Sequence, residues 1–130
     1  MKFKRTESFR HIFENRITSK YKVIMDGTVQ DFSSTSEFCQ LVDLSPSGAR
    51  IALNDNLPIE GKVCIIELLF VLYNKPIAVH GEVKWKRPAF GQYQYGIDLE
   101  TDELLETLII SELKLRRKQE IIDKKQQIKM

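Results

Sequence analysis

The stretch "VDLSPSGARIAL", residues 42–53, interrupts an apolar, strand-like run with five turn-forming or polar residues: Asp43, Ser45, Pro46, Ser47 and Gly48. Residues 39–44 and 49–53, on either side of the interruption, favour strands. Pro, Ser and Gly between two apolar runs are typical of a tight turn. The stretch therefore predicts a β-hairpin. Whether its polar groups only cap the turn or also hold a ligand stays open at this point.

Working outward, short apolar runs separated by turn residues predict six strands, at residues 16–25, 39–44, 49–53, 62–74, 77–87 and 93–99. The pair Asp26-Gly27 is suited to the positive φ angles of a hairpin turn. The polar residues 30–38 predict a loop or a short edge strand. The run 62–74 does not alternate cleanly, so we expect both of its faces to be covered.

Period two is clear in residues 77–87, where five residues fall on one face: Ile77, Val79, Gly81, Val83 and Trp85. We therefore expect Trp85 to be a barrel-face residue in step with Val79 and Val83. His80 falls on the opposite face, which predicts an ordinary surface histidine.

A helical period appears only after residue 100. Thr101 is the predicted N-cap, and one apolar stripe is expected to pack on the sheet: Leu104, Leu105, Leu108, Ile109 and Leu113. The second half, from about Arg116, has little apolar surface, which predicts a solvated, frayed or partner-bound segment. The fold class is thus all-β with a C-terminal helix, as a small antiparallel barrel or sandwich. We expect a basic arm at 1–15, a barrel at 16–100, and a helix with a basic tail at 101–130.

The chain has 130 residues, enough for one core. Its formal charge is only +2, which does not indicate a uniformly basic binder of nucleic-acid polymers. Cys39 and Cys64 lack CxxC spacing and no signal-peptide pattern is seen, which favours a reducing, cytoplasmic location. The longest apolar run, residues 63–73, is interrupted by Glu67 and is too short for a membrane helix. We therefore do not expect this chain to be an integral membrane protein.

The residues favour binding over catalysis. His11 and His80 are the two histidines, and neither has metal-ligand spacing with the cysteines. The sequence "DLSPSG" is not a GxSxG nucleophile elbow, and the glycines form no phosphate loop. No metal site, cofactor or enzymatic activity is predicted.

Two segments carry binding chemistry. The N-terminal "KRTESFR" offers Arg5 and Arg10, whose guanidinium groups suit phosphate oxygens and the faces of bases. In the hairpin, Asp43 matches the N1 and N2 donor edge of guanine and Ser45 adds a hydroxyl. Gly48 would permit an unusual backbone angle or the close approach of a ring. The candidate ligand is a nucleotide.

Asp43, Ser45 and Gly48 resemble the D/N-x-S-x-x-G signature of PilZ domains, the bacterial receptors for cyclic di-GMP. The basic "KRTESFR", the "GEVKW" and "YQYGIDL" strands and the helix "ELLETLIISELKLRRKQ" follow in the family's order, so the resemblance covers nearly the whole chain. It implies a six-stranded antiparallel barrel with a C-terminal helix. The family's arm usually carries R-x-x-x-R, whereas here the four residues "TESF" separate Arg5 from Arg10.

The resemblance implies a cyclic di-GMP receptor that orders its arm on the ligand and signals to a partner protein, in motility, surface polysaccharide or biofilm control. The implied site residues are Arg5, Arg10, Asp43, Ser45 and Gly48. Two alternatives remain. One is a degenerate PilZ-like adaptor that binds a protein and no nucleotide. The other is a small-barrel binder of single-stranded nucleic acid, which the few Lys and Arg residues of the middle strands disfavour.

Overall fold

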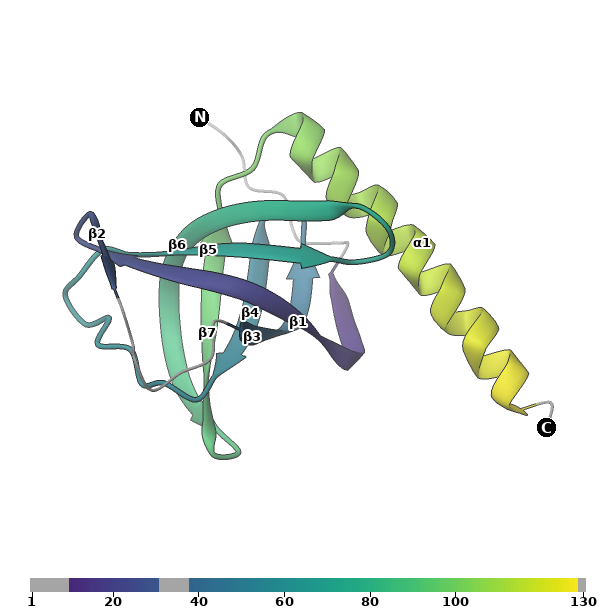
Figure 1. Ribbon diagram of the computed structural model, residues 1–130, viewed down its shortest axis with the longest axis horizontal. Helices are drawn as coiled ribbons and strands as arrows, with labels where there is room; N and C mark the ends of the chain where they lie inside the picture. The colour runs from purple at the N-terminus through teal and green to yellow at the C-terminus, as the bar shows by residue number, and fades with distance from the viewer. Residues whose placement is uncertain (1–9, 31–37, 129–130) are drawn as a thin grey trace.

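The computed structural model describes residues 10–30 and 38–128 as a closed six-stranded antiparallel β-barrel with one extra strand and a C-terminal helix (Figure 1). Its elements, in chain order, are β1 (His11–Met25), β2 (Thr28–Gln30), β3 (Phe38–Ser45), β4 (Gly48–Leu53), β5 (Cys64–Val71), β6 (Pro76–Ala89), β7 (Gln92–Leu99) and α1 (Glu103–Ile128). The predicted barrel with a terminal helix is confirmed.

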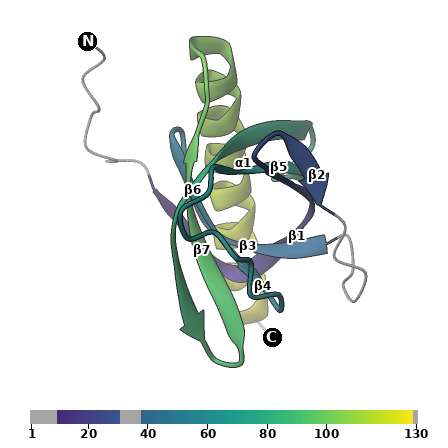
Figure 2. The ribbon, with the colours of Figure 1, turned by 90° about the vertical axis from the view of Figure 1, so that its left-hand side faces the viewer.

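The barrel closes because β1 pairs on both of its edges. The strand order is β1-β3-β4-β7-β6-β5, and β5 returns to pair with the second half of β1. Among the described strands, the short β2 pairs only with β1 and lies outside this ring (Figure 2). Strand β1 begins at His11, so residues 11–15, expected in the arm, form its start, and a register shift lies between Ile12 and Ile17.

Two hairpin turns follow directly from local sequence. Asp26 and Gly27 both have positive φ, as predicted, and join β1 to β2. Phe90 and Gly91 repeat this geometry between β6 and β7. Paired positive φ angles match the right-handed twist of the flanking strands.

Strand β5 alternates more regularly than its sequence suggested. Its even-numbered residues from Cys64 to Phe70 are buried, whereas Glu67, Leu69 and Val71 are exposed. The expectation that both faces are covered was therefore wrong, because apolar residues on an exposed face obscure the period-two pattern.

Tyr95 fixes the long connection between β4 and β5. Its hydroxyl donates a 2.5 Å hydrogen bond to the carbonyl of Asp55 and accepts a 2.8 Å bond from the amide of Leu57. Burial raises the pKa of Tyr95 to about 12, so the donor stays protonated at neutral pH. This loop is therefore tied to the core through one phenol.

Helix α1 begins at Glu103 and is capped by Asp102, whose Oδ1 accepts a 2.8 Å hydrogen bond from the amide of Leu105. Thr101, the predicted N-cap, instead donates to Glu106 Oε2. Ile109 and Leu113 enter the core, but Leu104 is 82% exposed and does not belong to the packed stripe. None of the described helical residues makes a segment both long and apolar enough to cross a bilayer.

Glu112 joins α1 to the turn between β5 and β6. Its buried carboxylate accepts 2.9 Å hydrogen bonds from the amides of Asn74 and Lys75. One turn later, Arg116 Nη1 donates to the carbonyl of Leu72 at 2.8 Å. The helix thus lies along one side of the barrel (Figure 1), and in its C-terminal half Lys124 pairs with Glu14 of β1 at 2.9 Å.

Candidate functional site

The β3–β4 hairpin places Asp43 opposite Arg50. Pro46 and Ser47 form the turn, Ser45 pairs with Gly48, and the register continues to the pair Asp43 and Arg50. The turn is also tied to the end of β7, because the amide of Leu99 donates to the carbonyl of Ser47 at 2.9 Å. Opposite charges on directly paired residues attract each other, so the hairpin register itself creates an ion pair.

Two arginines hold the Asp43 carboxylate. Arg50 donates to Asp43 Oδ2 from Nε at 2.9 Å and from Nη2 at 2.6 Å. Arg10, at the start of the described chain, donates to Oδ1 from Nη1 at 3.1 Å. The Asp43 side chain is only 1% exposed, against 24% for Arg50 and 44% for Arg10. Both carboxylate oxygens are therefore satisfied within the protein.

The two arginines border an open hollow of about 310 Å³ between the β3–β4 hairpin and the β6–β7 pair. Its lining residues are Arg10, Ser47, Gly48, Ala49, Arg50, Lys84, Trp85, Gly96, Ile97 and Asp98. Three of these side chains are cationic and one is acidic. An anion with a flat ring system fits such a lining, because cations attract the anion and Trp85 offers a ring face.

Trp85 lies on the outside of the barrel, contrary to the period-two expectation. The register between β6 and β7 shifts between Val83 and Trp85, which turns the indole outward and leaves it 41% exposed. The indole lies against Gly96, where an added Cβ would overlap the ring. The guanidinium of Arg87 also lies 5.3 Å from the ring centroid. The Trp85 indole is therefore fixed in position by its contacts with Gly96 and Arg87, yet it remains partly exposed.

A model of the PilZ domain family matches residues 4–114 of this chain, which is most of its length. The chain belongs to the PilZ domain family. PilZ domains are a cyclic di-GMP-binding type of domain and act as binding or adaptor modules rather than as enzymes. No curated protein matches the chain.

The PilZ barrel brings four of the five predicted site residues to one hairpin: Arg10, Asp43, Ser45 and Gly48. Arg5, the fifth, lies outside the described residues. Ser45 is buried and its hydroxyl donates to the carbonyl of Gly48 at 3.4 Å, so it closes the hairpin. Gly48 has no positive φ, so the expected unusual backbone angle is wrong, whereas the close approach of a ring stays a prediction.

Arg50, Lys84 and Trp85 also line the candidate site of this PilZ domain, and the sequence reasoning missed them. A signal existed for Arg50: with a two-residue turn at Pro46 and Ser47, hairpin pairing alone places residue 50 opposite Asp43. For Trp85 no such signal existed, because the shift in register depends on how β6 pairs with a strand that follows later in the chain.

The two cysteines of the PilZ barrel are buried and do not line the hollow at the β3–β4 hairpin. Burial raises the pKa of the Cys39 thiol to about 12 and also raises that of Cys64, so neither is a nucleophile at neutral pH. The described residues hold no group of three or more His, Cys, Asp or Glu side chains placed to bind a metal ion.

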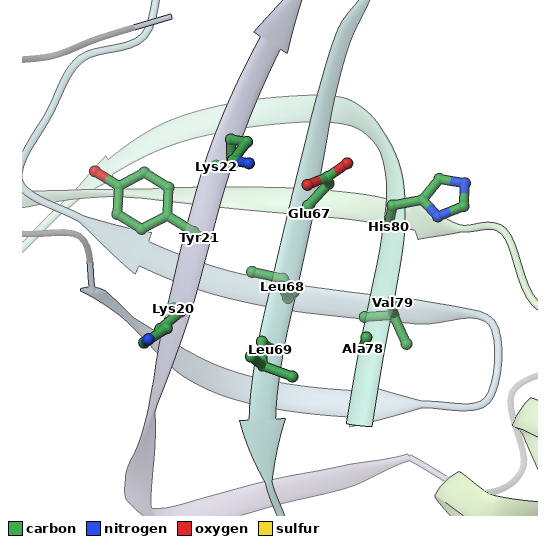
Figure 3. Close-up of a pocket in the computed structure, with 9 residues that line it drawn as sticks. All are labelled: Lys20, Tyr21, Lys22, Glu67, Leu68, Leu69, Ala78, Val79 and His80. Carbon is green, nitrogen blue, oxygen red and sulfur yellow. The ribbon is translucent and has the colours of Figure 1, made fainter. Parts of the chain in front are cut away.

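A wider hollow, about 520 Å³, lies on the outer face of β1, β5 and β6 (Figure 3). Lys22, Glu67 and His80 stand side by side there on three neighbouring strands, in register with one another. His80 is exposed, as predicted. Polar and charged side chains at neighbouring outward strand positions are typical of a solvated sheet face, so the cationic hollow at the β3–β4 hairpin remains the stronger site.

Proposed function

We propose that this PilZ domain is a cytoplasmic receptor for cyclic di-GMP and binds it in the hollow at the β3–β4 hairpin. The observation that carries the proposal is the cluster of Arg10 and Arg50 around Asp43, beside the accessible ring of Trp85. Cyclic di-GMP has two phosphodiesters and two guanines. Guanidinium groups pair with phosphate oxygens, and guanines stack on indole or guanidinium planes.

Ligand binding would exchange partners at Asp43. The sequence hypothesis assigned Asp43 to the guanine edge, yet without ligand its Oδ1 accepts from Arg10 and its Oδ2 accepts from Arg50. Arg10 is the more exposed of the two arginines and stands immediately before β1. We infer that Arg10 moves from Oδ1 to a phosphate, which frees Oδ1 for the donor edge of guanine.

The family's arm also enters this proposal. Arg10 is its last arginine, and Arg5 would supply a second guanidinium for phosphates or guanine faces. When a phosphate of cyclic di-GMP binds Arg10, the residues before Arg10 would order over the barrel. The ordered arm would create or hide a surface for a downstream protein.

Isothermal titration calorimetry with cyclic di-GMP tests the proposal. We expect micromolar or tighter binding to the wild-type chain, and loss of most of the heat in Arg10→Ala and Arg50→Ala. Lys22→Ala is the matched control, because Lys22 is a cation on the far outer face. Absence of heat at millimolar ligand, or an equal loss in the control, contradicts the proposal.

A second candidate function is an adaptor that binds a protein and no nucleotide. The observation that favours it is the complete satisfaction of Asp43 by Arg10 and Arg50, which needs no ligand. The adaptor reading predicts no cyclic di-GMP binding at any concentration. It also predicts a partner that is lost when the chain is truncated after Arg116.

A further inference from the structure

Helix α1 has two different apolar faces. The inner face carries Ile109 and Leu113, which are fully buried against the barrel. The other face lies in the second half of the helix, where Leu115, Ile121 and Ile122 are 39%, 49% and 46% exposed. A helix that covers one side of a barrel needs only one apolar face for packing. The exposed apolar side chains of the second face are therefore not required by the fold.

Two hollows connect this second face to the start of β1. The first lies along α1 and is lined by Ser111, Lys114, Leu115, Arg117, Lys118 and Ile121. The second lies between α1 and β1, and it shares Arg117 and Ile121 with the first while adding Ile12, which is 64% exposed. We call the continuous surface the α1–β1 strip and define it by Ile12, Lys114, Leu115, Arg117, Lys118 and Ile121.

The α1–β1 strip has an excess of positive charge. Within the described residues, no ion pair involves its Lys114, Arg117 or Lys118. The neighbouring carboxylates, in contrast, already have cationic partners: Glu14 pairs with Lys124 at 2.9 Å, and Glu120 with Arg116 at 3.0 Å. A binding partner of the strip therefore meets uncompensated cations around apolar side chains.

We propose that the α1–β1 strip is the docking site for an acidic amphipathic helix of a partner protein. Leucine-like side chains of that helix would cover Leu115, Ile121 and Ile12. Its carboxylates would pair with Lys114, Arg117 and Lys118. Charge complementarity of this kind gives specificity and steers association, and an apolar groove is the usual receptor for such a helix.

The charge pattern disfavours two other occupants. A second copy of this chain would bring the same cations of the strip against one another, which is repulsive. A lipid surface fits a helix whose cations flank an uninterrupted apolar sector. Within the strip, Lys118 lies between Leu115 and Ile121, three residues from each. A partner with carboxylates at matching positions fits this interleaving better.

Fluorescence anisotropy with two labelled helical peptides tests the inference on the full chain, without nucleotide. Both peptides carry leucine along one face; one has flanking glutamates and the other has lysines at the same positions. We expect the acidic peptide alone to bind, and its affinity to fall as salt is raised. Leu115→Glu and Ile121→Glu should each weaken it by roughly tenfold or more. Both residues are exposed, so circular dichroism should show an unchanged fold.

Val63→Glu is the matched control, because Val63 is as exposed as Ile121 but precedes β5. Equal binding of the two peptides, binding of neither, or an equal effect of Val63→Glu overturns the inference. A concentration-dependent dimer in light scattering that Leu115→Glu abolishes would assign the strip to a second copy and overturn it. So would binding to phosphatidylglycerol vesicles that Leu115→Glu abolishes, with no binding of the acidic peptide.

Discussion

Asp43 shows how one side chain serves both the fold and the candidate site. Burial of a carboxylate is costly unless it is paired and hydrogen-bonded, and both oxygens of Asp43 meet that condition through Arg10 and Arg50. The partners are unequal, because Arg50 donates twice and is less exposed than Arg10. Arg50 therefore supports the hairpin, whereas the more exposed Arg10 is the partner that we propose to exchange on ligand binding.

This inequality gives a stability prediction. Asp43→Asn should lower the free energy of unfolding by about 2 kcal/mol, because it leaves the partly buried Arg50 without its counter-charge. Arg10→Gln should lower it by less than about 1 kcal/mol, since the Arg10 side chain is 44% exposed and Arg50 still pairs with Asp43. Urea denaturation of both variants measures the difference. Equal losses would show that Arg10 is as structural as Arg50.

Two glycines of the hollow differ in what a methyl group would meet. At Gly96 it would overlap the indole of Trp85, whereas at Gly48 it would stand 3.5 Å from Ser45 Oγ, an ordinary contact. Gly96→Ala should therefore displace the indole and shift the emission of Trp85, the single tryptophan, at a cost of about 1–3 kcal/mol. Gly48→Ala, the control, should leave emission and stability near wild type. An unchanged spectrum in Gly96→Ala would contradict the packing described.

Residue patterns alone locate part of the candidate site. The stretch with Asp43, Ser45 and Gly48 predicts the β3–β4 hairpin that the structure shows, because turn chemistry is local. The same stretch cannot show that the Asp43 oxygens are occupied. Arg10 is far from Asp43 in sequence, and the pairing of β1 with β3 brings the two together.

Strand β6 illustrates the limit of periodicity within one element. Val79 and Val83 face the core as the period-two pattern predicts, but the register shift after Val83 moves Trp85 to the opposite side. A bulge adds one residue to one strand relative to its partner. The sequence of β6 alone contains no record of that partner, so the error could not be avoided.

Helix α1 was predicted well in type and less well in detail. Its buried stripe of Ile109 and Leu113 follows the helical period, whereas Leu104 points away from the barrel. The N-cap was one residue off, because Asp102 and Thr101 are both good caps and local sequence does not rank them. The role of Glu112 had no sequence signal, since it depends on a turn 37 residues earlier.

Glu112 gives a pH prediction for the docking of α1. Burial opposes its ionisation, but backbone amides of Asn74, Lys75 and Tyr73 outweigh burial and lower its pKa below the ordinary 4.5. A lowered folded-state pKa means that this stabilisation is present above the unfolded pKa and is lost as pH falls through the folded one. Glu112→Gln should cost about 1 kcal/mol at neutral pH and reduce the acid-induced loss.

Denaturation series at neutral and acidic pH measure this effect. Glu82→Gln is the control, because Glu82 is 41% exposed and pairs with Lys84 on the surface. Parallel pH profiles for wild type and Glu112→Gln would show that the carboxylate charge of Glu112 does not stabilise the helix.

The whole molecule depends on pairings that the chain's local patterns do not encode. Six strands and a terminal helix were predictable from runs and turns, and their order matched a known family. Closure depends on β1 pairing with β3 along its first half and with β5 along its second. That arrangement joins Arg10 to the hairpin and brings the start of β1 against α1, where Arg10 borders both the candidate site and the α1–β1 strip.

The most direct test of the proposed receptor is an amide and indole NMR titration of the full chain with cyclic di-GMP. We predict saturable shifts of the Trp85 indole N–H and of the Gly48, Arg50 and Gly96 amides, which line the hollow at the hairpin. The amides of Lys22 and His80 should not move. A spectrum unchanged at millimolar ligand, or shifts centred on the face of Lys22 and His80, would contradict the proposal.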